Sequence, residues 1–265
     1  MPTLDFERFM KEMKDLPLVE TAESCAASYK LRKELESYAA RLKPEELTQA
    51  IDFLEEVAAS SPYRDIDAPG AELHHRQTSG QDVSLTAVRT LAFIASLFPE
   101  KGAEIVGRLD TLAQNSQDWD IRKEAIGAIG VLVIMKSQQS ATVAEGVAAL
   151  EAQGATNSNA YIRMHALASL FSAGRENEQL LPRAIETHIR ASEDPDKSVR
   201  MQVLAALGKR AVSRSSTDEE AKSLLSVFEK AAAKKPERDE AKFIEERIVA
   251  VQKRLKDGPV PRRFP

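Results

Sequence analysis

The stretch "DPDKSVRMQVLAALGKRA", residues 194–211, joins an acidic turn, a Val-Arg pair and a row of small apolar residues. Two upstream stretches align with it without a gap: "SQDWDIRKEAIGAIG" from Ser116 and "NSNAYIRMHALASLF" from Asn157. Each begins with a residue type that caps helices, Ser116, Asn157 or Asp194, and then places a β-branched residue before an Arg. The chain therefore contains an internal repeat.

Weaker copies extend the pattern in both directions. "AVRTLAFIASLF" contains Val88-Arg89, and "FIEERIVAVQKRL" contains Ile244 without the Arg, so that the β-branched positions are separated by 33, 41, 37 and 45 residues. Within a copy, apolar residues recur at i, i+4, i+5, i+7 and i+8, which makes one wide apolar stripe on a helix. A second amphipathic helix precedes each stripe. Each copy therefore predicts a helix-turn-helix unit that must stack on its neighbours to bury its apolar face.

This pattern resembles the HEAT-repeat family over about residues 83–256. The resemblance is carried by Asp118, Ile121, Arg122, Ala125, Ala128 and Ile129 in one unit and by Asp196, Val199, Arg200, Val203, Ala206 and Leu207 in another. It implies an all-α fold, an α-solenoid of stacked antiparallel helix pairs in a right-handed superhelix.

The resemblance also implies a ladder of Asp and Arg side chains along the stack. Its members here would be Asp118, Arg122, Arg163, Asp196 and Arg200. Asn159 and Leu85 stand where two further units would have the Asp, so we expect the ladder to be broken at both. The arginine row looks like a phosphate-binding surface, but the resemblance makes these side chains structural.

Composition agrees with a helical chain. Of 265 residues, 43% are hydrophobic and 29% charged, while only 11 are Gly and 5% are aromatic, which favours helix over sheet. The single cysteine, Cys25, excludes an intrachain disulfide, and the N-terminal sequence has no secretory pattern, so we expect a cytoplasmic protein. No apolar run is long enough to span a bilayer.

Four segments are expected along the chain. Residues 1–60 would form an N-terminal helical cap and the first helix of the array, and residues 84–256 the HEAT-like repeats. Between them, residues 61–83 would form a long inter-helix loop that folds over one edge of the solenoid and contributes Tyr63, His74 and His75 to a partner site. A loop with no task is the alternative. Residues 257–265 would form a Pro-rich basic tail.

No motif in the chain predicts catalysis, a cofactor or a metal site. His74 and His75 lie near carboxylates, but they show no recognisable ligand spacing. Cys25 has no base nearby in sequence, as a nucleophile would need. "DWD", residues 118–120, offers an aromatic ring beside carboxylates, as in HEAT-like DNA glycosylases, but Trp119 is the only tryptophan and Asp residues also favour a helix start.

The leading hypothesis is a non-catalytic scaffold or adaptor that binds a protein or peptide along the concave face, which the second helices would line. Two methionines at equivalent positions would give an adaptable apolar contact, unless both pack against the neighbouring repeat. The candidate contact residues lie off the apolar stripe: Lys123, Glu124, Met164, His165, Met201, Gln202 and Lys209.

Two alternatives remain open. Residues 195–265 carry 17 Lys and Arg against 11 Asp and Glu, whereas residues 1–194 carry 20 against 30. The basic C-terminal part could bind nucleic acid, as a DNA glycosylase-like protein would, although it has no aromatic platform. The residues concerned are Lys197, Lys209, Arg210, Arg214, Lys234, Lys235, Arg262 and Arg263. The second alternative is an immunity or inhibitor protein.

Overall fold

The computed structural model describes residues 42–60, 83–135 and 139–258, together with the single residues 11, 30 and 33. Every regular element in these ranges is helical, and no strand occurs in them. The chain divides into two compact units, residues 1–153 and 154–265, with the boundary inside one helix. The expected loop 61–83, apart from Val83, and most of the tail 257–265 lie outside the described residues, as do residues 1–41 apart from the three single ones.

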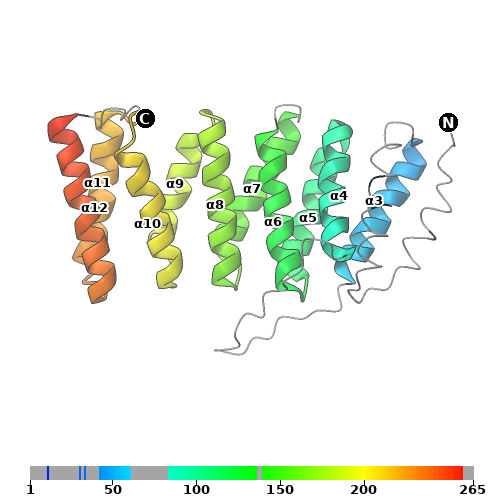
Figure 1. Ribbon diagram of the computed structural model, residues 1–265, viewed down its shortest axis with the longest axis horizontal. Coiled ribbons are helices and arrows are strands. Elements are labelled where there is room, and N and C mark those ends of the chain that lie inside the picture. Colours follow the sequence, from blue (N-terminus) through cyan, green and yellow to red (C-terminus); the bar gives the residue numbers. More distant parts are fainter. Residues whose placement is uncertain are drawn as a thin grey trace. The chain divides into compact units, whose positions relative to one another are not determined.

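The described residues of the first unit include two antiparallel helix pairs. α3 (Pro44–Ala59) packs against α4 (Val83–Leu97), and, after the 3-10 turn η2 (Pro99–Lys101), α5 (Gly102–Asn115) packs against α6 (Trp119–Ile134). α4 also packs against α6, and α3 against α5, so that the second helices form one layer and the first helices another (Figure 1). α7 (Ser140–Thr156) follows and contains the unit boundary.

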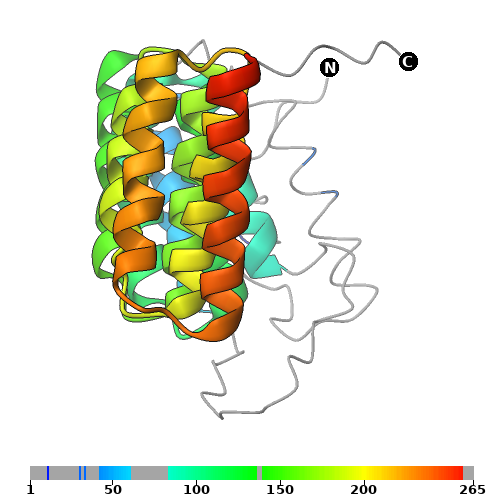
Figure 2. The ribbon, with the colours of Figure 1, turned by 90° about the vertical axis from the view of Figure 1, so that its left-hand side faces the viewer.

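The second unit repeats the arrangement. It contains α8 (Ala160–Glu176), α9 (Leu181–Ala191), α10 (Lys197–Ala211), α11 (Asp218–Ala233) and α12 (Arg238–Asp257). α10 packs against both α8 and α12, which makes these three second helices neighbours. α11 and α12 run antiparallel at the C-terminal end of this unit (Figure 2).

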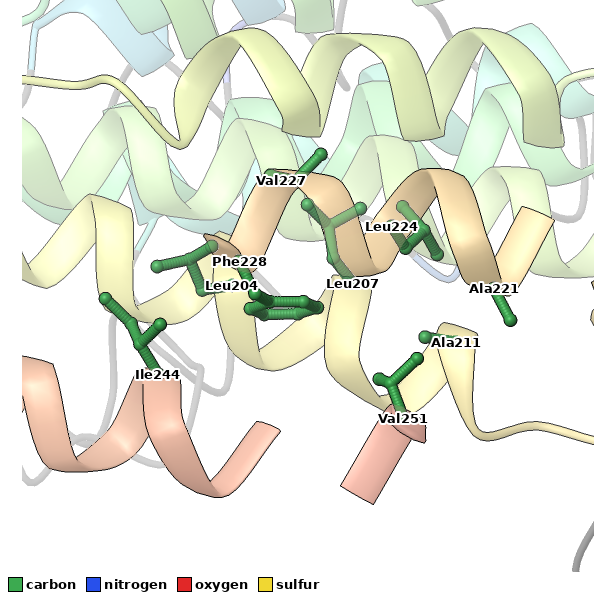
Figure 3. Close-up of a cluster of buried hydrophobic side chains, with 9 residues drawn as sticks. All are labelled: Leu204, Leu207, Ala211, Ala221, Leu224, Val227, Phe228, Ile244 and Val251. Carbon is green, nitrogen blue, oxygen red and sulfur yellow. The ribbon is translucent and has the colours of Figure 1, made fainter. Parts of the chain in front are cut away.

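The small and branched residues of the repeat form the core. In the second unit, Leu204, Leu207 and Ala211 of α10 meet Phe228 and its neighbours on α11, and Ile244 and Val251 of α12 close the cluster (Figure 3). The β-branched residues Ile121, Ile162 and Val199 are all fully buried. The fold is therefore all-α and built of stacked antiparallel helix pairs, as the repeat predicts. The handedness of a superhelix stays a prediction.

The turn that begins each second helix uses two side chains rather than one. Ser116, Asn157 and Asp194, expected as caps, instead accept hydrogen bonds from the backbone N–H two residues on, at 3.1, 2.9 and 2.8 Å. The caps are Asp118, Asn159 and Asp196, whose side chains accept from the first N–H groups of the helices. The sequence expectation was thus two residues early, because both positions carry the same short polar residue types.

Candidate partner-binding surface

Three of the repeated arginines, Arg89, Arg163 and Arg200, contact a carboxylate of the following repeat. In the second unit, Arg163 places Nε and Nη2 2.8 and 2.7 Å from the two carboxylate oxygens of Asp194. Its Nη1 donates to the carbonyl oxygens of Asn157 and Ser158 at 2.8 and 3.3 Å. Arg163 therefore ties the turn of its own repeat to the turn of the next.

Arg200 repeats this geometry one helix pair later. It forms a two-point contact with Glu240 of α12 at 2.8 and 2.9 Å, and its Nη1 donates to the carbonyls of Asp194 and Pro195, each at 3.0 Å. In the first unit, Arg89 of α4 pairs in the same way with Glu124 of α6 at 2.7 and 3.2 Å. Arg89, Arg163 and Arg200 are therefore engaged within the fold.

The carboxylates in these contacts differ from the ladder expected by resemblance. Asp196 caps α10 and leaves Asp194 and Glu240 to pair with Arg163 and Arg200. Nor does the row stop where the Asp is replaced: Asn159 caps α8 as an Asp would, and Leu85 lies in the buried part of α4. The physical reason is that a capping side chain is hydrogen-bonded to the backbone of its own helix, which leaves other carboxylates to pair with the arginines.

Electrostatics strengthens the two pairs of the second unit. Burial raises the pKa of the Asp194 carboxyl, but hydrogen bonds from Arg163 and from the Asp196 N–H, with the charges of both arginines, hold that pKa below its ordinary value. The hydrogen bond from Arg200 lowers the pKa of Glu240 against the opposing effect of burial. Both carboxyls are thus ionised partners in the folded state.

Several predicted contact residues also serve the fold. Glu124 is taken by Arg89, and the Gln202 amide donates to the carbonyl of Met164 at 2.8 Å. Met164 is half-buried and packs against the cluster of Leu167, Val199 and Val203, and Met201 is half-buried too. Neither methionine is fully exposed, and Met164 takes up the alternative in which it packs against the neighbouring repeat.

Other predicted contact residues are more accessible. Lys123 and Lys209 are exposed, and His165 is half-buried. The ammonium of Lys123 lies 4.9 Å from the centre of the Trp119 ring, a cation–π contact on the first turns of α6. Tyr63, His74 and His75 lie outside the described residues, so the loop prediction stays a prediction.

Many cations of the C-terminal part are held in ion pairs. Lys197 contacts both Glu237 and Asp239 at 2.7 Å, Lys234 contacts Glu193 at 2.8 Å, and Arg210 forms a two-point contact with Glu220. Lys209, Arg214 and Lys235 are exposed, whereas Arg262 and Arg263 lie outside the described residues. Local carboxylates therefore offset much of the positive charge that the sequence count suggests.

An apolar stretch on the surface was missed by sequence reasoning. Val131 and Ile134 of α6 are 54% and 36% exposed, and Leu97, at the end of the adjacent α4, is 40% exposed. The repeat alignment could have indicated this exposure, because Val131 aligns with Ser172 and Lys209, and polar residues are typical of a solvent-facing position. Tyr161 of α8 is a further exposed aromatic residue, at 51%.

No group of three or more His, Cys, Asp or Glu residues that could hold a metal ion occurs among the described residues. In the same ranges, no helix combines the length and apolar character needed to cross a membrane.

No model of a known protein family matches the chain, and no curated protein matches its sequence significantly. Solved structures with a similar arrangement include an engineered protein of a structural genomics consortium, with 18% identity, a TM-score of 0.41, and coverage of 97% of this chain and 98% of that one. A designed armadillo-repeat protein has 16% identity, a TM-score of 0.42, and coverage of 93% and 100%. Another, in complex with the peptide (KR)4, has 15% identity, a TM-score of 0.43, and coverage of 93% and 99%. These scores are too low to bear on function.

Proposed function

We propose that the chain is a HEAT-like scaffold that binds a protein or peptide through exposed residues of its second helices. The observation that carries this proposal is that some residues of the second helices join neighbouring repeats and others are left exposed. The repeated Arg89, Arg163 and Arg200 are used to join repeats, whereas other residues of the second helices are exposed: Lys123 and Val131 of α6, Tyr161 of α8 and Lys209 of α10. Exposed apolar and aromatic residues among polar ones are typical of protein-binding surfaces.

The nucleic-acid alternative has less support from the described contacts. A nucleic-acid surface needs cations that can neutralise phosphates, and Lys197, Arg210 and Lys234 already contact carboxylates. A filter-binding assay at two salt concentrations separates the alternatives. Tight binding with a steep salt dependence would favour nucleic acid over a protein partner.

Partner capture from cell extract followed by mass spectrometry tests the proposal, provided that matched surface variants are compared. The double variant Tyr161→Glu/Lys209→Glu changes exposed residues of α8 and α10. The control Lys222→Glu/Glu229→Lys changes exposed residues of the first helix α11. We expect at least one partner to be lost from the first variant and kept by the control. Partners held equally by both variants, and by a Val131→Glu variant, would contradict the proposal.

A further inference from the structure

The exposed residues of α6 form a single line along the helix. Lys123, Gly127, Val131 and Ile134 are the exposed residues between Trp119 and Ile134, and successive members are separated by three or four positions. Residues with this spacing share one face of a helix. We call Trp119, Lys123, Gly127, Val131 and Ile134 the α6 line. It changes from an aromatic and cationic start to an apolar end.

Gly127 in the middle of the α6 line has no explanation within the fold. A glycine inside a helix costs about 1 kcal/mol relative to alanine. At Gly174, by contrast, close packing requires the glycine, because a Cβ there would lie 3.0 Å from both the Leu181 Cα and the Ala184 Cβ. A Cβ on Gly127 would meet nothing within 4 Å. The missing side chain therefore leaves an open notch on the exposed face of α6.

The two ends of the α6 line differ in the partner group that they favour. The ammonium of Lys123 makes its contact with the Trp119 ring, and it is paired with no carboxylate in the part of the chain that the structure describes. Two turns further on, Val131 and Ile134 expose apolar surface. A complementary partner carries a carboxylate at one end and apolar side chains at the other.

We infer that the α6 line is the docking site for an amphipathic helix of a partner protein that crosses α6 at Gly127. A helix can approach closely only where the residue at the crossing point is small, which is the role of the notch. Its apolar residues lie against Val131 and Ile134, and an acidic side chain about 12 Å away along the axis reaches Lys123, since eight residues separate Lys123 from Val131 at 1.5 Å each. This inference rests on the proposed function and names the partner's chemistry.

A displayed library of 16-residue helical peptides, selected against the full chain, provides the probe. We expect the enriched peptides to combine an acidic residue with apolar residues on one helical face. The dissociation constant of each would be measured by fluorescence anisotropy on purified variants. Gly127→Leu should weaken binding at least tenfold, because the new side chain fills the notch.

Gly107→Leu is the matched control. Gly107 also lies inside a helix where a Cβ would meet nothing within 4 Å, but it belongs to α5, the first helix of the same pair. Both substitutions should keep or raise the melting temperature, and only Gly127→Leu should reduce binding. Lys123→Glu should also weaken binding, and replacing the acidic residue of the peptide by Lys should restore it.

Each other outcome overturns the inference in a recognisable way. The α6 site would be overturned, and the proposed function would stand, if peptide binding were unchanged by Gly127→Leu and Lys123→Glu but abolished by Tyr161→Glu/Lys209→Glu. Enrichment of no peptide would overturn the inference of a helical partner, whereas the proposed function would still be decided by the capture experiment. A wild-type dimer in sedimentation equilibrium that Gly127→Leu converts to monomer would make a second copy of the chain the occupant.

Discussion

Within each unit, arginine–carboxylate ion pairs join neighbouring second helices, but these pairs are more deeply buried in the second unit than in the first. In the second unit, the side chains of Arg163 and Asp194 are 10% and 6% exposed, and Glu240 opposite Arg200 is 3% exposed. In the first unit, Arg89 and Glu124 are 35% and 30% exposed. The same ion-pair motif can therefore contribute differently to stability in each copy, because the contribution of an ion pair depends on its exposure to solvent.

The surfaces of the units differ as well. The α6 line of the first unit ends in exposed Val131 and Ile134, whereas the position aligned with Val131 on α10 of the second unit is Lys209. The second unit thus has buried ion pairs between its helices, whereas the first unit has exposed apolar residues that the packing of its helices does not explain. Substitutions that separate these two roles sharpen the comparison.

The largest expected effect is on the buried pair of the second unit. Arg163→Met should destabilise that unit by about 3–5 kcal/mol, because it leaves the Asp194 carboxylate buried without its partner. Arg89→Met in the first unit should cost about 1 kcal/mol or less, because Glu124 stays partly hydrated. Hydrogen exchange of peptides from α8 and α10 reports on the second unit, and the fluorescence of the single tryptophan, Trp119, reports on the first. Equal losses from the two variants would show that burial does not set the difference.

A second effect is confined to mildly acidic pH. His188 of α9 is buried, with Nδ1 2.9 Å from the Ala184 carbonyl oxygen and its ring 4.6 Å from that of Phe171. Burial lowers the pKa of His188 to about 4, against the opposing effect of that hydrogen bond. The unfolded chain, with an ordinary histidine pKa near 6.5, binds the proton first as the pH falls. The contribution of neutral His188 is thus fully present above about pH 6.5 and is lost as the pH falls toward 4.

We therefore expect the second unit to lose roughly 3 kcal/mol of stability between pH 6.5 and 4, at about 1.4 kcal/mol per pH unit. His188→Leu should flatten the pH dependence in this window. The measurement is urea unfolding at a series of pH values, followed by hydrogen exchange of α9 and α10. The contribution of Asp194 and Glu240, whose pKa values are lowered in the fold, is lost at lower pH, as these carboxyls become protonated. An unchanged slope in the His188→Leu variant would rule out this histidine as the source.

The smallest expected effects concern two glycines, one in each unit. Gly127→Ala should stabilise the first unit by about 1 kcal/mol, because the gain in helix propensity meets no steric cost. Gly174→Ala should instead destabilise the second unit, because the new Cβ would lie 3.0 Å from the backbone of Leu181, which cannot rotate away. Thermal unfolding by circular dichroism measures both. If Gly127→Ala destabilised the chain, the notch in the α6 line would have a role inside the fold.

The sequence by itself determined the class of fold. The repeat at Ile121, Ile162 and Val199 places small and branched residues on one face of each second helix, and burial of that face needs only the helical period and a neighbour of the same kind. Pro44 likewise stands at the first position of α3, where the fixed φ of proline suits a helix start.

Only the tertiary structure decided which carboxylate each arginine meets and which exposed residues are left for a partner. Asp194 and Asp196 are two residues apart and of the same type, yet one pairs with Arg163 and the other caps α10. Met164 and Lys123 occupy equivalent positions of the repeat, yet one packs between helices and the other is exposed. Contacts of this kind depend on the distance between neighbouring helices and the reach of each side chain. A helical period specifies the face on which a residue lies but not the atoms that come to meet it.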